Sequence, residues 1–389
     1  MALERSEETA RVVGADKHEL ATPCLLLDLD KFESNIQKMA AHTATSSIGL
    51  RPHAKSHKCP EIARRQIAAG ALGVCAATIT EAENMAAARI TGVLITSEMV
   101  GSDKIARLVR LTQKAPDTMS VLDSPAHARQ LGEAAEAHGV LLNVLVDLDL
   151  GLRRTGVAGV DAGMSLAETI VSLKGLSLWG VNAYSSMSAH VVGLADRRKH
   201  SLRAMETAVE LFLKMEAAGM PARILSGGST GTYNIDTEIG EMTELQAGSY
   251  IFMDVDYAMI GGQSGPVYDD FQQALTVLTT IISKNHQGIA TVDGGFKAFA
   301  TDRPFGPQAQ GSDATKYHFA GDEHGIIELP VRNLGESDSF GNDFPLGGKL
   351  EFVVPHCDPN VNLYDQLYCV RGNTVEAVWP IARGYSSGQ

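Results

Sequence analysis

Short apolar runs alternate with longer amphipathic runs from about residue 24 onward. The apolar runs are rich in β-branched residues, which is typical of buried strands, and the runs between them are Ala-rich with helical periodicity. The candidate strands begin at residues 24, 49, 73, 92, 118, 143, 176 and 222. Eight strands alternating with helices over about 200 residues predict an α/β fold, a (β/α)8 TIM barrel. A doubly wound open sheet is the alternative, but no GxGxxG fingerprint follows the first candidate strand.

The pattern changes after about residue 265. Strand-like runs such as "ALTVLTTIIS", "KLEFVVPH" and "TVEAVWPIA" are joined by turns rich in Gly, Pro and Asp, with little helical periodicity. This pattern predicts a mostly β domain. We therefore expect a barrel over residues 22–267 and a β domain over residues 268–389, with residues 1–21 as a candidate to pack on the second domain.

Composition and charge narrow the possible partners. The 389 residues suffice for two hydrophobic cores. A formal net charge of -13 argues against a nucleic-acid or anionic-membrane partner. The five cysteines are scattered without a CxxC motif, which favours a reducing compartment. The first 20 residues have no apolar core, and no run of 18 apolar residues occurs, so we expect a cytoplasmic protein with neither signal peptide nor membrane span.

The stretch "LRPHAKSHKCP" places Lys55 at a strand-to-helix connection, which in a barrel lies at the rim that carries the chemistry. Lys55 is flanked by His53 and His57 and is close to Arg51. Clustered cations lower the pKa of a lysine and help it act as an amine nucleophile. The alternative is an ordinary solvated lysine on a loop.

Other polar residues follow later candidate strands and are expected at the same rim. Asp149, Arg154 and Gly156 follow the strand at 143, and Tyr184 and His190 follow the strand at 176. Taken singly, the arginine could be an ion-pair partner and the histidine a polar residue at a helix start. Their coincidence at one rim favours a functional site.

The segment "SGGSTGT", residues 226–232, follows the strand at 222. Its glycines allow the backbone to approach an anion closely, and Ser229, Thr230 and Thr232 add hydroxyl groups. It lacks the lysine of a P-loop. A flexible loop is the alternative. A phosphate-binding loop together with a rim lysine indicates pyridoxal phosphate, which needs a lysine for its Schiff base and a site for its phosphate.

Six motifs spread over nearly the whole chain extend this interpretation. They are "RPHAKSHK", "GLRRTGV", "SGGSTGT", "ELQAGSYIFMD", "DEHG" and "PHCDPNVNLYD". With them the chain resembles the fold-type III pyridoxal-phosphate enzymes, which have an alanine racemase type of barrel followed by a β domain. It is most similar to the branch that holds D-threonine aldolase, 3-hydroxy-D-aspartate aldolase and D-serine dehydratase.

The resemblance implies roles for single residues. Lys55 is the Schiff-base lysine, and Arg154 faces the phenolic oxygen of the cofactor. Gln246 stands where alanine racemases have an arginine near the pyridine nitrogen, and a neutral amide does not compel that nitrogen to stay protonated. The cofactor-binding residues implied in this way are Lys55, Arg154, Tyr184, Gly228, Ser229, Thr230, Gln246 and Tyr257.

A metal site is expected in the β domain. Residues two apart on an extended chain face the same side, so His356 and Asp358 of "PHCDP" converge if the preceding strand continues through them. A bulge would bring Cys357 to the ion instead. An isolated H-x-D is a weak signal, but the resemblance implies a divalent metal here, with aspartate in the aldolase branch and cysteine in the dehydratase branch. An imidazole and a carboxylate suit Mn²⁺ or Mg²⁺ and do not exclude Zn²⁺.

The resemblance therefore implies a retro-aldol cleavage of a D-β-hydroxy-α-amino acid of the D-threonine or D-3-hydroxyaspartate type, with His190 as general base. The alternative is a D-serine or D-threo-3-hydroxyaspartate dehydratase, which releases ammonia and a 2-oxo acid. A racemase is disfavoured by Gln246, and a non-catalytic cofactor carrier by the metal motif. Arg303 could bind a substrate carboxylate or form a surface ion pair. By analogy with two-domain relatives we expect a homodimer.

Overall fold

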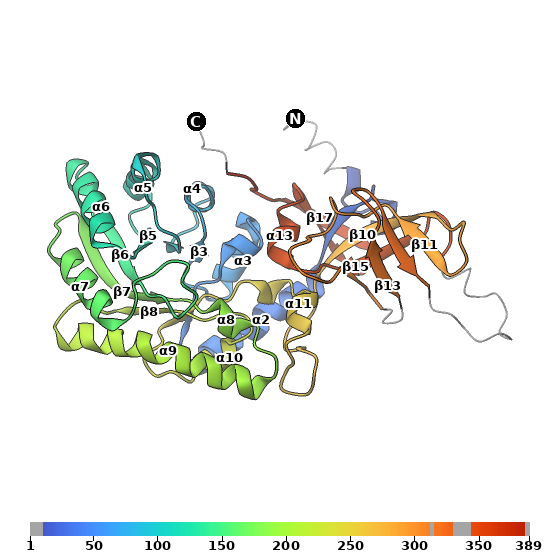
Figure 1. Ribbon diagram of the computed structural model, residues 1–389. Coiled ribbons are helices and arrows are strands. Elements are labelled where there is room, and N and C mark those ends of the chain that lie inside the picture. The colour runs from blue at the N-terminus through green and yellow to red at the C-terminus, as the bar shows by residue number, and fades with distance from the viewer. Residues whose placement is uncertain (1–10, 312–314, 330–343, 386–389) are drawn as a thin grey trace. The chain divides into compact units, whose positions relative to one another are not determined.

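The computed structural model describes residues 11–311, 315–329 and 344–385. These residues form two compact units. One unit comprises Ile36–Tyr250, Ile260–Pro266 and, at the end of the described chain, Tyr385. The other comprises the described chain up to Asn35, Ile251–Met259 and the described part of Val267–Gly384. Each unit has its own sheet (Figure 1).

The first unit, the barrel unit, is built on eight parallel strands in the order β2-β9-β8-β7-β6-β5-β4-β3. A parallel bridge between His53 and Cys75 joins the two ends of this order, which closes the ring. The strands are β2 Gly49–Leu50, β3 Val74–Ala76, β4 Val93–Ile95, β5 Met119–Leu122, β6 Leu142–Asp147, β7 Leu176–Ala183, β8 Ile224–Gly227 and β9 Glu244–Leu245. The predicted (β/α)8 barrel is confirmed, with one change in the strands that form it.

That change concerns the first and last strands. The candidate strand at 24, β1 Cys24–Asp28, pairs with strands of the other unit, antiparallel with β10 and parallel with β16. The ring is completed instead by β9, whose two residues are too few to produce a strand pattern in the sequence. An apolar run of five residues suits either kind of sheet, so only the tertiary pairing distinguishes them.

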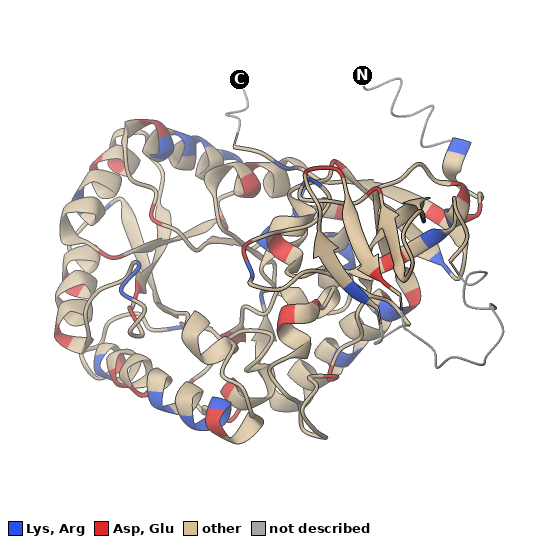
Figure 2. Cartoon of the chain, turned by 45° about the vertical axis from the view of Figure 1, so that its right-hand side comes forward, with Lys and Arg blue, Asp and Glu red and all other residues tan. Residues whose placement is uncertain are grey.

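Helices surround the barrel strands (Figure 2), and basic and acidic residues are interspersed along their outer faces. In the helix from Ser102 to Lys114 the buried residues include Ile105, Leu108, Val109 and Thr112, which stand at positions i, i+3, i+4 and i+7, as expected for a helix with one face on the core. The helical segments of this unit are α2 Leu29–Ser46 (from Ile36 onward), η2 Ala54–Ser56, α3 Pro60–Ala68, α4 Ile79–Ala87, α5 Ser102–Lys114, α6 Pro125–Ala137, α7 Val160–Val171, α8 Ser186–Ala189, α9 Leu194–Ala217, α10 Tyr233–Asp236 and η3 Ser249–Ile251.

Apolar side chains fill the interior of the ring. Strands β3, β4, β5, β6 and β8 contribute to one buried cluster, against which Trp179 of β7 packs. The cluster comprises Cys75, Leu94, Met119, Val121, Leu145 and Ile224. Since the interior is packed, ligands can be received only at the ends of the strands.

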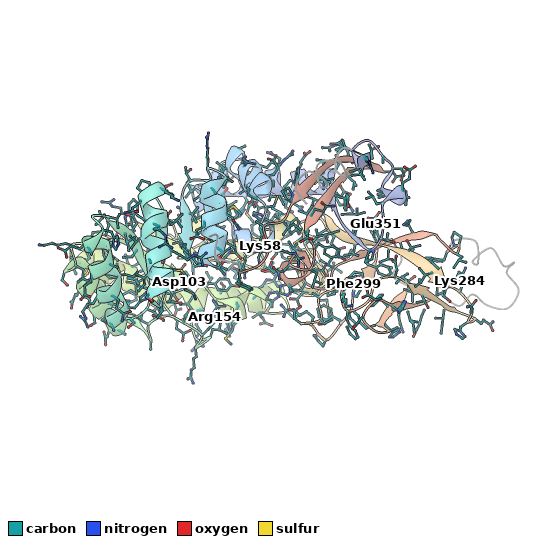
Figure 3. The ribbon with its side chains drawn as sticks, turned by 90° about the horizontal axis from the view of Figure 1, so that it is seen from above. Lys58, Asp103, Arg154, Lys284, Phe299 and Glu351 are labelled. Carbon is teal, nitrogen blue, oxygen red and sulfur yellow. The ribbon has the colours of Figure 1, made fainter. Side chains whose placement is uncertain are left out.

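The second unit, the β unit, is a nine-stranded sheet with the path β13-β14-β11-β10-β1-β16-β17, in which β15 pairs with β10 and β12. Leu26, Leu278 and Val370 lie in its core. Phe299, seen in Figure 3, is fully buried against Tyr317. The remaining elements are η1 Lys17–Glu19, α11 Val255–Ala258, β10 Leu275–Ser283, β11 Ile289–Val292, β12 Gln308–Ala309, β13 Lys316–Phe319, β14 Gly325–Glu328, β15 Lys349–Val353, α13 Cys357–Val361, β16 Gln366–Arg371 and β17 Thr374–Pro380.

Two further facts bear on the predictions for the whole chain. The backbone N–H of Gly14 donates to the carbonyl of Val375 at 2.8 Å, and that of Lys17 donates to Asn373 at 2.7 Å, so this N-terminal segment contacts the sheet of the β unit. Among the described residues, no helix is both long and apolar enough to cross a membrane.

Candidate active site

Lys55 lies in η2, the single helical turn that connects β2 to α3 at the carboxyl end of the barrel strands. The turn begins at His53, whose Nδ1 accepts the backbone N–H of Lys55 at 3.4 Å and whose Nε2 lies 3.0 Å from the hydroxyl of Thr96. The Lys55 side chain is partly exposed. This confirms the predicted strand-to-helix connection and places an amine at the rim of the barrel.

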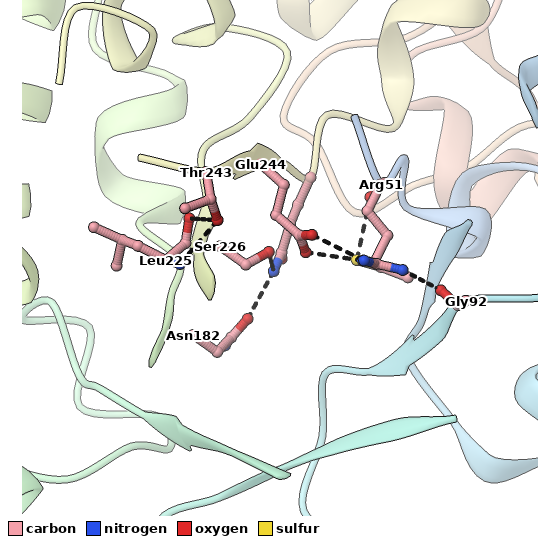
Figure 4. Close-up of polar contacts among 9 residues, drawn as sticks. Arg51, Gly92, Asn182, Leu225, Ser226, Thr243 and Glu244 are labelled. Atoms are coloured by element: carbon pink, nitrogen blue, oxygen red, sulfur yellow. Dashed lines mark hydrogen bonds and ion pairs between the residues drawn. The ribbon is translucent and has the colours of Figure 1, made fainter. Parts of the chain in front are cut away.

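The prediction that Lys55 is surrounded by uncompensated cations is wrong for Arg51. Arg51 forms a buried bidentate ion pair with Glu244, with Nε–Oε1 at 2.8 Å and Nη2–Oε2 at 2.9 Å (Figure 4). Its Nη1 donates to the carbonyl of Gly92. The charge of Arg51 is therefore compensated by a carboxylate that sequence spacing, with 193 positions between the partners, could not reveal.

A second carboxylate lies within electrostatic range of Lys55. Burial raises the pKa of Glu81, and the N–H of Ala77, Lys58 and Lys55 oppose that rise. Lys58 Nζ lies 3.6 Å from Glu81 Oε1, and both side chains are almost fully buried. Lys55 thus stands in a mixed field of cations and a carboxylate rather than among cations alone.

The glycine-rich segment after β8 is tightly shaped. Gly228 has a φ of +75°, and a Cβ added there would lie 2.8 Å from Asp236 Oδ2 and 2.9 Å from Leu245 Cδ2. Thr232 Oγ1 accepts the backbone N–H of Ser229 at 3.1 Å and lies 2.9 Å from its hydroxyl. The turn brings backbone and hydroxyl groups close together at a position where a side chain would not fit. This arrangement suits the binding of an anionic group such as a phosphate.

Asp236 lies behind this segment and was not recognised from the sequence. Its carboxylate accepts the hydroxyls of Ser201 at 2.6 Å and Thr232 at 2.5 Å. Complete burial raises the pKa of Asp236 to about 6, and the two hydroxyls oppose that rise. The buried carboxylate fixes the Thr232 hydroxyl, and through it the conformation of the segment around Ser229.

Gln246 follows β9 and is almost fully buried. Its Nε2 donates to Asn182 Oδ1 at 2.7 Å and to Ser226 Oγ at 2.8 Å. Asn182 and Ser226 are labelled in Figure 4. Asn182 in turn donates from Nδ2 to Asp147 Oδ1 at 2.6 Å. These residues end β7, β8 and β6, so a continuous polar chain crosses the rim of the barrel. A charged or amide residue at the end of an apolar strand, as in "NVLVDLD", is the sequence signal that could have drawn attention to it.

Three other predicted residues also lie beyond the carboxyl ends of barrel strands. Arg154 is exposed in the loop after β6, with its guanidinium carbon 5.8 Å from the centre of the Tyr184 ring. Tyr184 follows β7, and His190 caps the end of α8. A cation over an aromatic face at this distance is attractive. The barrel unit thus presents Lys55, Arg154, Tyr184, His190, Gly228 to Thr230 and Gln246 at one rim.

The predicted metal ligands lie in the β unit, but their local geometry differs from the expectation. Strand β15 ends at Val353, and His356 is the N-cap of α13, so Asp358 lies in the first turn of a helix. The argument from strand alternation is therefore wrong. Cys357 is fully buried, and its N–H donates to Asp254 Oδ2 at 2.8 Å. Tyr257 lies on the adjacent helix α11, where Asp254 Oδ1 accepts its N–H at 2.9 Å.

His356 has an orienting partner. Its Nδ1 lies 2.7 Å from Asp302 Oδ2, which leaves Nε2 for a metal ion. Arg303 pairs with Asp256 at 2.8 Å and with Asp302 at 3.4 Å, so in this structure it forms ion pairs within the β unit. Within the described ranges no group of three or more His, Cys, Asp or Glu side chains is placed to hold a metal. An imidazole and a carboxylate nevertheless fit a hard divalent ion that keeps several waters.

The fold and the rim together define a class of protein: an alanine racemase type of barrel with a lysine after the first ring strand, a glycine-rich segment after the seventh, and a separate β unit. The model of the alanine racemase N-terminal domain matches residues 27–256. That of a putative serine dehydratase domain matches residues 274–370. The chain belongs to this alanine racemase-like family, in the branch that includes the D-threonine and 3-hydroxy-D-aspartate aldolases.

Individual relatives cover nearly the whole chain. A 3-hydroxy-D-aspartate aldolase of Paracoccus denitrificans (strain Pd 1222) is 35% identical over 95% of this chain and 94% of its own length. The crystal structure of D-threonine aldolase from Filomicrobium marinum is 34% identical, with a TM-score of 0.87 over 95% of this chain and 97% of that one. A D-threo-3-hydroxyaspartate dehydratase of a Delftia species is 29% identical over 87% of this chain and 90% of its own length.

Proposed function

We propose that this protein is a carbon–carbon lyase that uses pyridoxal 5'-phosphate and a divalent metal to cleave D-β-hydroxy-α-amino acids of the D-threonine or D-3-hydroxyaspartate type. Glycine and an aldehyde are the products, and with hydroxyaspartate the aldehyde is glyoxylate. The names of the relatives at 35% and 34% identity support an aldolase. The predicted metal ligands in the β unit favour the aldolase over the dehydratase. His356 and Asp358 offer a nitrogen and an oxygen ligand, whereas Cys357 is fully buried.

The barrel residues would hold the cofactor. Lys55 would carry its aldehyde carbon on Nζ, and Gly228, Ser229 and Thr230 would receive its phosphate. Arg154, Tyr184 and Gln246 would contact its ring. When bound in this way, pyridoxal phosphate supplies an electron-withdrawing system that accepts the electron pair of a bond broken at Cα.

The remaining roles are proton transfers and charge stabilisation by this chain. In our proposal the imidazole of His190 takes the proton of the substrate β-hydroxyl as the Cα–Cβ bond breaks. The Lys55 amine, freed when the substrate amine takes its place on the aldehyde carbon, would return a proton to Cα. His356 and Asp358 would hold the divalent ion, Mn²⁺, Mg²⁺ or Zn²⁺, which lowers the pKa of a hydroxyl bound to it.

Product analysis tests this proposal. Purified protein with pyridoxal phosphate and Mn²⁺ is offered D-threonine, D-3-hydroxyaspartate and D-serine in separate reactions. We expect glycine and an aldehyde from the first two, abolished by EDTA and by Lys55→Ala but retained in the control Lys104→Ala, which changes an exposed lysine. Absence of turnover with bound cofactor would contradict the proposal.

A dehydratase is the second candidate, because the serine dehydratase domain model covers the segment with the metal pair. It would release ammonia and a 2-oxo acid in the same assay, and that result would replace the aldolase. The shared residues would then serve departure of the β-hydroxyl after loss of the Cα proton.

We further propose a cytoplasmic homodimer. The five cysteines lie in the described ranges, are buried and form no disulfide, which suits a reducing compartment. The dimer rests on analogy with two-domain relatives, and sedimentation equilibrium of the holoenzyme tests it. A mass of one chain, 41.4 kDa, would refute it.

A further inference from the structure

The side-chain amide of Gln246 has no hydrogen left to offer a ligand. Nε2 carries two hydrogens, and it donates to Asn182 Oδ1 at 2.7 Å and to Ser226 Oγ at 2.8 Å. Both bonds are buried. The remaining polar atom of the side chain is the carbonyl oxygen Oε1, which can only accept a hydrogen bond.

The carboxylate of Asp147 fixes the orientation of the Gln246 amide through one intervening residue, Asn182. An amide can present either its nitrogen or its oxygen to a neighbour, so the orientation of Gln246 depends on that of Asn182. Asn182 Nδ2 donates to Asp147 Oδ1 at 2.6 Å, and an ionised carboxylate can only accept. Asn182 must therefore turn its nitrogen to Asp147 and its oxygen to Gln246. Thr155, which donates to Asp147 Oδ2 at 3.1 Å, holds the carboxylate itself.

The charged groups around Asp147 favour its role as the hydrogen-bond acceptor for Asn182. Glu98, after β4, is hydrogen-bonded to Asp147, and burial followed by the charge of Asp147 raises the pKa of Glu98 to about 8. The raised pKa favours the protonated form of Glu98, which can donate a hydrogen bond to Asp147. Burial also raises the pKa of Asp147, while the bonds from Asn182, Glu98 and Thr155 oppose that rise. Asp123, after β5, adds a further negative charge near both.

We propose that Asp147 is a positioning residue: through Asn182 it holds Gln246 so that its carbonyl oxygen faces the ligand, and the site therefore selects a ring nitrogen that carries a proton. This rests on the proposed function, in which Gln246 contacts the pyridine nitrogen of pyridoxal phosphate. An arginine at this position would disfavour the protonated nitrogen by charge, whereas an acceptor oxygen favours it. A protonated ring withdraws electrons more strongly, which suits a reaction that breaks a bond at Cα.

The test is the protonation state of the bound ring. The enzyme is loaded with pyridoxal phosphate labelled with ¹⁵N in the ring, and the ¹⁵N chemical shift is recorded from pH 6 to 9. We expect a protonated nitrogen in the wild-type holoenzyme at neutral pH. In Asp147→Asn, which lets both amides rotate, we expect the proton affinity of the nitrogen to fall about tenfold or more, the worth of one hydrogen bond to a charged group. The control Asp103→Asn, which changes an exposed aspartate of the same unit, should keep the wild-type shift.

Two further variants separate positioning from a structural defect. Gln246→Leu removes the acceptor and keeps Asp147, and it should lower the proton affinity as Asp147→Asn does, even if the Asp147 variant binds cofactor poorly. Gln246→Glu in the Asp147→Asn background offers a charged acceptor and should restore the proton. An unprotonated ring in the wild-type holoenzyme, or the wild-type shift in Gln246→Leu, would overturn the inference. Failure to bind pyridoxal phosphate at all would instead refute the proposed function.

Discussion

His356 Nδ1 lies 2.7 Å from Asp302 Oδ2. The two residues are 54 positions apart, and the pairing leaves Nε2 as the ring nitrogen for the metal ion proposed above. A carboxylate on one nitrogen fixes the tautomer and the ring orientation and makes the other nitrogen a better ligand. Asp302 thereby joins His356 and Asp358 in the function proposed for the β unit, although it does not contact the ion in that proposal.

Asp302→Asn should weaken binding of the divalent metal by about 10- to 100-fold, because the amide keeps the shape of the side chain but loses the charge that orients His356. Calorimetric titration of the metal-free protein with Mn²⁺ measures the change in metal affinity. Asp322→Asn is the matched control, since Asp322 is an exposed aspartate of the same unit, 3.8 Å from Lys297. Equal affinities in the two variants would show that Asp302 does not support a metal site.

Loss of the Glu244 carboxylate should strongly destabilise the barrel. Glu244→Ala leaves the buried guanidinium of Arg51 without its partner, which costs about 3–5 kcal/mol. The midpoints of thermal unfolding of Glu244→Ala and Glu238→Ala are each compared with that of the wild type. Glu238 pairs with Arg198 in the same bidentate way but on the surface, so its loss should leave the midpoint nearly unchanged. A small shift in both would mean that burial does not govern the strength of these pairs.

Gly228→Ala should reduce the affinity for pyridoxal phosphate about tenfold or more. The φ of +75° is unfavourable for alanine, and the added methyl would lie 2.8 Å from Asp236 Oδ2, so the segment must move. Cofactor fluorescence on titration gives the dissociation constant. In the control Gly240→Ala the methyl group meets nothing within 4 Å, and the affinity should not change. Pyridoxal lacks the phosphate group. With pyridoxal, the dissociation constants of Gly228→Ala and the wild type should therefore differ much less than they do with pyridoxal phosphate.

The buried Asp236 should make stability depend on pH between about 4 and 6. Its pKa is raised from 3.8 to about 6 in the folded chain, so over this window the folded state binds more protons than the unfolded state. Stability therefore falls as pH rises through the window, by at most about 3 kcal/mol from this group. Asp236→Asn abolishes that contribution, so the unfolding midpoint of the variant should rise relative to wild type from pH 4 to pH 7.

The control for this pH effect is Glu210→Gln, which changes an exposed carboxylate of α9 and keeps the buried Asp236 carboxylate. Its pH profile should run parallel to that of the wild type. A constant difference between Asp236→Asn and wild type across the range would mean that the Asp236 carboxylate has its ordinary pKa in the folded protein.

The strand pattern was sufficient for much of the fold. The alternation of apolar and Ala-rich runs predicted the barrel, and the loss of helical periodicity after about residue 265 predicted the β unit. The pattern was insufficient for β1 and β9. An isolated apolar run such as "CLLLD" does not reveal which sheet it joins, and two residues such as Glu244 and Leu245 carry no period at all.

The candidate site divides in the same way. By itself the sequence determined which residues follow which strands, because parallel strands in a barrel place their carboxyl ends at one rim. Lys55 and Gly228 were found by that rule, whereas Gln246 was found only through the family resemblance, because β9 was not predicted. Only the tertiary structure decided what those residues face. The partners of Arg51, His356 and Gln246 are 193, 54 and 64 positions away, and hydrogen-bond direction and protonation depend on such partners and on burial, which have no local sequence signal.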